Sequence, residues 1–136
     1  MPVASQIVIT GQSKPGVLAQ VVSVLAGAKV NIKAFSAPEV TGKGNLRLLV
    51  SDVDQARAAL RAAKVKFREE TALVLSLENK PGALSDVADL LKKARINIKC
   101  GYCTPSREGS RAIVVLTVSN TSKALGLLRG QSLDEF

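Results

Sequence analysis

The chain repeats itself, and this duplication constrains its fold more than any other feature of the 136 residues. Lys14-Pro15-Gly16-Val17-Leu18 returns as Lys80-Pro81-Gly82-Ala83-Leu84. At the same spacing, Asn31-Ile32-Lys33 returns as Asn97-Ile98-Lys99 without a gap. A repeat of this kind indicates two copies of one structural unit, each too small to bury much core alone, so that the two are expected to dock.

Each copy predicts the same order of secondary-structure elements. Apolar and β-branched runs predict strands, and apolar residues at helical spacing predict two helices per copy. Asp52 and Asn120 are natural helix N-caps, and Pro15 and Pro81 suit the first position of the helix that follows strand one. The expected strands are 6–11, 30–37, 46–51 and 65–69 in the first copy, and 73–77, 96–104, 112–119 and a short 133–136 in the second. Turn residues cluster at 38–45 and 105–109.

The order strand–helix–strand–strand–helix–strand in about 65 residues is the split βαβ, ferredoxin-like arrangement. We therefore predict an α+β protein of two tandem ferredoxin-like βαββαβ modules, 1–70 and 71–136, whose antiparallel sheets carry their helices on one face. The junction Arg68-Glu69-Glu70-Thr71 contains no Gly or Pro. Strand four of the first module is thus expected to run almost directly into strand one of the second.

Charge and aromatic content bear on nucleic-acid binding. The net charge is +8, and a basic βαββαβ protein suggests RNA recognition. RNA-recognition modules stack bases on aromatic side chains of their central strands. Only 3% of the residues are aromatic, and the run Asn45-Leu46-Arg47-Leu48 in the third strand has none. RNA binding stays an alternative, but nucleic acid is not the expected partner.

Residues that could carry catalysis are scarce. Histidine, the commonest general base and metal ligand, is absent. Cys100-Gly101-Tyr102-Cys103 has CxxC spacing, but residues i and i+3 of a strand point to opposite faces, and further Cys or His ligands for zinc are missing. A nucleophile–base pair or carboxylate dyad does not stand out either. We therefore expect no enzyme, no metal site and no cofactor.

These residues resemble the ACT family, the small-molecule regulatory module of amino-acid metabolism. The resemblance rests on a strand, Pro-Gly-x-Leu, a helix and Asn-Ile at the next strand. It reads Asn79-Lys80-Pro81-Gly82-Ala83-Leu84 through Asn97-Ile98 in the second copy, and Lys14 through Ile32 in the first. The chain looks like a tandem ACT protein with no attached enzyme, and the resemblance implies an allosteric, regulatory role.

The resemblance also implies a ligand site. In that family an amino-acid effector typically sits where two modules meet, between the loop after strand one of one module and the Asn at strand two of another. Asn79 matches the polar loop position, whereas Ser13 stands there in the first copy and puts a second equivalent site in question. If one site works, the resemblance favours the second copy's loop facing Asn31. The residues so implied are Asn79, Lys80, Pro81, Gly82, Ala83, Leu84, Asn31, Ile32, Ser13, Gly16 and Asn97.

General chemistry supports the same loops. Backbone N–H groups at a helix N-terminus are unpaired donors at the positive end of the macrodipole and suit a carboxylate. Gly16 and Gly82 leave room for a ligand near the backbone, and an asparagine amide both donates and accepts. Taken singly, each residue has an alternative structural explanation, since Pro-Gly commonly only opens a helix and Asn commonly only caps a turn.

Expectations about location and partners follow from the rest of the chain. No apolar run approaches the roughly 20 residues that cross a bilayer, and the N-terminus has no signal-peptide pattern. Two cysteines without a targeting segment fit a reducing cytoplasm. We expect a cytoplasmic protein that binds a free amino acid and has no membrane partner. A homodimer is expected, and a separate partner enzyme, with this chain as its regulatory subunit, is a further alternative.

Overall fold

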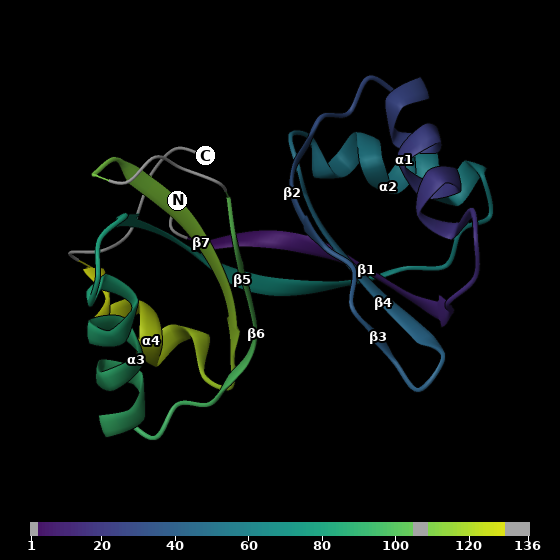
Figure 1. Cartoon of the computed structure of the whole chain (residues 1–136). Helices are drawn as coiled ribbons and strands as arrows, with labels where there is room; N and C mark the ends of the chain where they lie inside the picture. The colour runs from purple at the N-terminus through teal and green to yellow at the C-terminus, as the bar shows by residue number, and fades with distance from the viewer. Residues whose placement is uncertain (1–2, 105–108, 130–136) are drawn as a thin grey trace. The chain divides into compact units, whose positions relative to one another are not determined.

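The computed structural model describes residues 3–104 and 109–129, which form two compact units. The first unit is Ser5–Glu70, and the second contains the described residues of 1–4 and 71–136. The elements are β1 (Val3–Gln12), α1 (Val17–Gly27), β2 (Ile32–Ser36), β3 (Glu39–Val40), β4 (Lys43–Val50), α2 (Val53–Ala62), β5 (Arg68–Glu78), α3 (Ala83–Lys93), β6 (Ile98–Cys103), β7 (Arg111–Val118) and α4 (Thr121–Leu127). Within each unit both helices lie on the same side of the strands (Figure 1). This is the α+β, ferredoxin-like arrangement that the repeat predicts.

In the first unit the strand order is β2-β4-β1, followed by the beginning of β5. β1 and β2 both run antiparallel to β4, with Ile7 opposite Leu48 and Gln12 opposite Lys43. Because side chains alternate along a strand, every second residue of β1 and β4 faces the helices. The buried core of this unit is Ile7, Ile9, Val21, Leu25, Val30, Leu46, Leu48, Ala56 and Leu60.

The second unit repeats this design with β6-β7-β5. Leu73 pairs with Leu116 and Leu75 with Val114, so the period-two leucines of the sequence do face one core. Val3, at the start of β1, packs against this core and not against that of the first unit. The buried core is Leu73, Leu75, Leu77, Val87, Leu91, Ile96, Val114, Leu116, Val118, Ala124 and Leu128.

Strand boundaries differ from the prediction where the chain passes from one unit to the other. Strand four of the first copy was expected at 65–69, but β5 begins at Arg68 and continues to Glu78 without a break. Val65 and Phe67 instead pack their side chains against the first core, which explains their apolar character. The expected strand 133–136 and the turn at Pro105 lie outside the described residues.

Helix starts fall into two kinds. Asp52 and Asn120 are confirmed as N-caps, since their side chains accept hydrogen bonds from the backbone N–H groups of Gln55 and Lys123. The prediction for the Pro-Gly helices was wrong in one detail. Pro15 and Pro81 precede the N-cap, and the N-cap is the glycine that follows, Gly16 or Gly82, each with φ 92°.

Candidate functional site

The loop between β1 and α1 is held by backbone hydrogen bonds. The Ser13 N–H donates to the carbonyl of Gly42 at 2.9 Å, which ties the loop to the β3–β4 hairpin. The hairpin turn is Thr41-Gly42, both with positive φ, as a two-residue type I′ turn requires. After Gly16 the chain enters α1, and the Gln20 N–H donates to the Gly16 carbonyl at 2.9 Å. The loop is therefore fixed at both ends.

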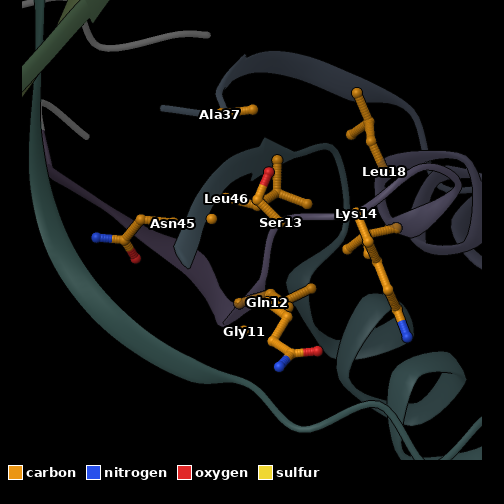
Figure 2. A pocket seen from close by; sticks show the side chains of 11 residues that line it. Gly11, Gln12, Ser13, Lys14, Leu18, Ala37, Asn45 and Leu46 are labelled. Carbon is orange, nitrogen blue, oxygen red and sulfur yellow. The ribbon is translucent and has the colours of Figure 1, made fainter. Parts of the chain in front are cut away.

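A cavity of about 260 Å³ lies against this loop. Its position is set by the antiparallel register, which brings Gln12 opposite Lys43 and Gly11 opposite Gly44, at the same end of the sheet as the end of β2. Figure 2 shows the side chains of Ser13, Leu46, Leu18 and Ala37 among those that line the cavity. The aliphatic lining residues are Ile9, Val17, Leu18, Ala37 and Leu46, and the others are Gly11, Gln12, Ser13, Lys14, Gly44 and Asn45.

The start of α1 borders the cavity and has an uncompensated positive end. Gly16 offers no side-chain cap, and the first turn of α1 contains no acidic residue. Backbone N–H groups of a first helical turn have no partner within the helix. Val17 and Leu18, in that first turn, line the cavity. The Val17 N–H donates to the Lys14 carbonyl at 3.4 Å, so the donors left for an anion are those that follow it in the turn, at the positive end of the helix dipole.

The second copy has the same backbone but different charges. Gly82 is again an N-cap with φ 92°, and the loop is again tied down, because Asn79 N–H donates to the Ser110 carbonyl at 2.7 Å. Here, however, Glu78 pairs with Lys80 at 3.1 Å, and Asp86 lies in the first turn of α3. The repeat places neutral Gln12 and Gln20 at the corresponding positions of the first copy.

The other residues predicted at the second loop, 80–84, have packing and hydrogen bonds that the structure describes. Ala83, the first residue of α3, packs against the core of its unit, whereas Leu84 beside it is exposed. Lys80 accepts a hydrogen bond at its carbonyl from the Ala83 N–H at 3.4 Å, and Pro81 lies between them in this turn. This backbone pattern is the same as that of Lys14 and Val17 in the first copy.

The asparagines at strand two lie at the other end of their own sheets. The Asn31 N–H donates to Ser51 Oγ at 2.9 Å, and the Ser51 N–H donates back to the Asn31 carbonyl at 2.9 Å. Asn97 and Ser119 make the same pair of bonds. Since Ser51 follows β4 and Lys43 begins it, Asn31 is separated from Ser13 by the length of β4, about 25 Å at about 3.3 Å per residue.

The structure thus brings Ser13 and the first turn of α1 together with residues that were not predicted as part of a site. Asn31 and Ile32 are not part of this cavity, and Ile32 packs against the first core. Contributions of Asn31 or Asn97 to a ligand site formed with another module stay predictions. Gln12, Ala37 and Asn45 were missed because three separate segments supply them.

Comparison with known proteins decides the family. A family model described as an ACT domain pair matches residues 1–134. The chain belongs to the ACT family. ACT domains are regulatory rather than catalytic modules, and this chain has two of them.

Solved structures with this fold come from several sources. A Bacteroides thetaiotaomicron protein is 32% identical, with 95% of this chain and 88% of that chain covered and a TM-score of 0.86. The ligand-free regulatory subunit of aspartate kinase from Thermus thermophilus is 18% identical, with 95% of each chain covered and a TM-score of 0.65. Its counterpart from Thermus flavus is 18% identical, with 95% and 94% covered and a TM-score of 0.62. No curated protein sequence matches the chain.

Other candidate features of this ACT domain pair have ordinary surroundings. Cys100 is half-buried and Cys103 exposed, and both are free thiols on β6. Within 3–104 and 109–129, no three His, Cys, Asp or Glu side chains gather as metal ligands would. In the same ranges, no helix has the length and apolar character needed to span a membrane.

Proposed function

We propose that this ACT domain pair is a non-catalytic regulatory protein that binds a free amino acid. The ligand carboxylate lies at the start of α1, inside the cavity of the first unit. The observation that carries the proposal is the coincidence of a 260 Å³ cavity with a helix start that has neither a side-chain cap nor an acidic first turn. Pockets for drug-sized ligands span roughly 300–1,000 Å³, so this cavity suits a smaller molecule.

The difference between the two copies supports this location. Glu78 and Asp86 place negative charge beside the start of α3, which disfavours a second anion there. In the first copy Gln12 and Gln20 stand at those positions and remove that repulsion. The second copy's loop, with Asn79 as the residue that the ACT pattern favours, stays a second candidate site.

The regulatory role is proposed by analogy with structures of the same fold. Two of them are regulatory subunits of aspartate kinase. The corresponding proposal here is that the chain changes the activity of a separate amino-acid-biosynthetic enzyme when the amino acid binds. A co-purified enzyme whose activity responds to the amino acid only when this chain is present supports it. An enzyme whose activity and response to the amino acid are the same with and without the chain contradicts this proposal.

A thermal-shift screen of the whole chain against the twenty amino acids tests ligand binding. A ligand that binds only the folded state stabilises it, by about 2.7 kcal/mol at a hundredfold excess over Kd. At least one free amino acid should raise the melting temperature, and the corresponding amino-acid amide, which keeps the ammonium but lacks the carboxylate, should not. If all twenty leave the melting temperature unchanged, the proposal is wrong.

Exchanging the neutral residue at position 12 and the acidic residue at position 78 tests which copy binds the ligand. Gln12→Glu gives the first copy the residue of the second, and Glu78→Gln does the reverse. A carboxylate at a helix start changes the free energy by about 0.3–1 kcal/mol, so Gln12→Glu should weaken binding about two- to fivefold, and less at high salt. Glu78→Gln should leave the affinity unchanged. If Glu78→Gln alone alters it, the ligand binds at the second loop.

A further inference from the structure

The walls of the first-unit cavity carry information about the ligand's side chain. We infer that the amino acid bound there has an uncharged aliphatic side chain of three or four carbon atoms, as valine, leucine and isoleucine do. This inference rests on the proposed function and deepens it. It uses the aliphatic side chains that line the cavity, in addition to the backbone donors at the helix start.

Aliphatic surface dominates that part of the cavity. Ile9 and Leu46 come from the paired strands β1 and β4, and both belong to the first core. Leu18, from α1, and Ala37, directly after β2, line the same space (Figure 2). A wall built mainly from hydrocarbon favours a hydrocarbon side chain, by about 0.8 kcal/mol for each buried methylene group.

Charged ligand side chains find no partner there. None of the eleven lining residues is Asp or Glu, so the ammonium of lysine or the guanidinium of arginine would be desolvated without a counter-charge. The single lining cation is Lys14, and Figure 2 shows its ammonium pointing away from Ala37 and Ser13. A side-chain carboxylate of aspartate or glutamate would therefore also lie against hydrocarbon without a cation beside it.

A calorimetric titration series on the whole chain measures this preference. The probes are L-alanine, L-2-aminobutyrate, L-valine and L-leucine, which lengthen the side chain stepwise, with L-threonine and L-aspartate as polar counterparts of valine and leucine. Each added methylene should tighten binding about fourfold. Valine should bind about tenfold tighter than threonine, and leucine than aspartate, because the polar group exchanges hydration for a mainly hydrocarbon wall.

A variant of the wall tests whether this cavity sets the preference. Ala37 is exposed at the end of β2, so Ala37→Val should fold, and its extra carbon atoms should narrow the cavity. It should reduce leucine affinity about tenfold while changing alanine affinity little. Cys103→Val, at the matching position of the second copy, is the control and should change neither.

The outcomes separate this inference from the proposed function. If no amino acid binds, both fail. If aspartate, lysine or phenylalanine binds tighter than valine, leucine and isoleucine, amino-acid binding stands and the aliphatic preference is wrong. If aliphatic ligands bind but Ala37→Val leaves the ratio of leucine to alanine affinity unchanged, this cavity does not select them, and the inference is again overturned.

Discussion

Glu69 offers the sharpest test of the electrostatics that hold the first unit together. Its carboxylate accepts hydrogen bonds from Arg57 Nε at 2.7 Å and Arg57 Nη2 at 2.8 Å. Ser5 Oγ donates a third at 2.6 Å, so β1, α2 and the start of β5 meet at this group. The hydrogen bonds from Arg57, and then the one from Ser5, lower the pKa of Glu69 to about 2. Glu69→Gln keeps the shape of the side chain and removes its charge.

The expected loss of stability follows from this pKa and from the exposure of the pair. A fall from the ordinary value of about 4.3 would correspond to about 3 kcal/mol if it were retained in full. The side chains of Glu69 and Arg57 are 27% and 29% exposed, however, and solvent screens such pairs to about 0.2–1 kcal/mol. Hydrogen bonds to charged groups add to this. We expect Glu69→Gln to lower the free energy of unfolding by about 1–2 kcal/mol at pH 7.

The pH dependence distinguishes this charge effect from a packing effect. Because the pKa of Glu69 is lower in the folded state, its stabilisation is fully present above the unfolded value and is lost as the pH falls from about 5 to about 2. The difference between wild type and Glu69→Gln should therefore shrink over that range. Urea denaturation followed by circular dichroism at pH 7, 5 and 3 measures it. Glu39→Gln, an exposed glutamate on β3, is the matched control for net charge. A difference that is as large at pH 3 as at pH 7 would refute the reasoning.

Three further predictions use the same denaturation assay. Gly82→Ala should lower the free energy of unfolding by about 1–2 kcal/mol because φ is +92° at Gly82. Gly27→Ala, in the last turn of α1, should raise it by about 0.5–1 kcal/mol. Equal effects of the two substitutions would contradict the backbone argument. Asp52→Ala should cost about 1 kcal/mol by removing the N-cap of α2, and Asp52→Asn should restore most of it. Leu60→Ala should cost about 2–5 kcal/mol because the side chain is fully buried, and a loss under 1 kcal/mol would place Leu60 outside the core.

Much of the fold could be predicted because the duplication supplied every pattern twice. Leu25 and Leu91 occupy the same helical position in the two copies, and both are fully buried in their own cores. Apolar period, N-cap residues and turn residues are local properties, so one sequence contains them. The boundary at Arg68 could not be predicted in the same way, since Val65 and Phe67 are apolar for a tertiary reason, packing, and not because they pair in a sheet.

The cavity was harder to predict because it depends on register. Asn45 lines it because β4 pairs with β1 so that Asn45 lies opposite Thr10, whose hydroxyl donates to the Asn45 amide oxygen at 3.0 Å. Ala37 joins them only because β2 ends at the same edge of the sheet. The sequence alone does not determine how β4 pairs with β1 or with β2. The loop after β1 could therefore be predicted, but Asn45 and Ala37 could not be predicted to lie beside it.

The two copies nevertheless contained a clue that the family pattern obscured. The pattern favours the loop with Asn79, and so directs attention to the second copy. A comparison of charge instead of identity favours the first copy for the proposed anion site, because Glu78 and Asp86 of one helix start correspond to Gln12 and Gln20 of the other. Duplicated units share their fold by inheritance, so differences of charge at equivalent positions around a helix start bear on ligands more than shared residues do. For the site proposed here, the polar positions at which the copies differ therefore discriminate between the two loops, and the shared Pro-Gly residues do not.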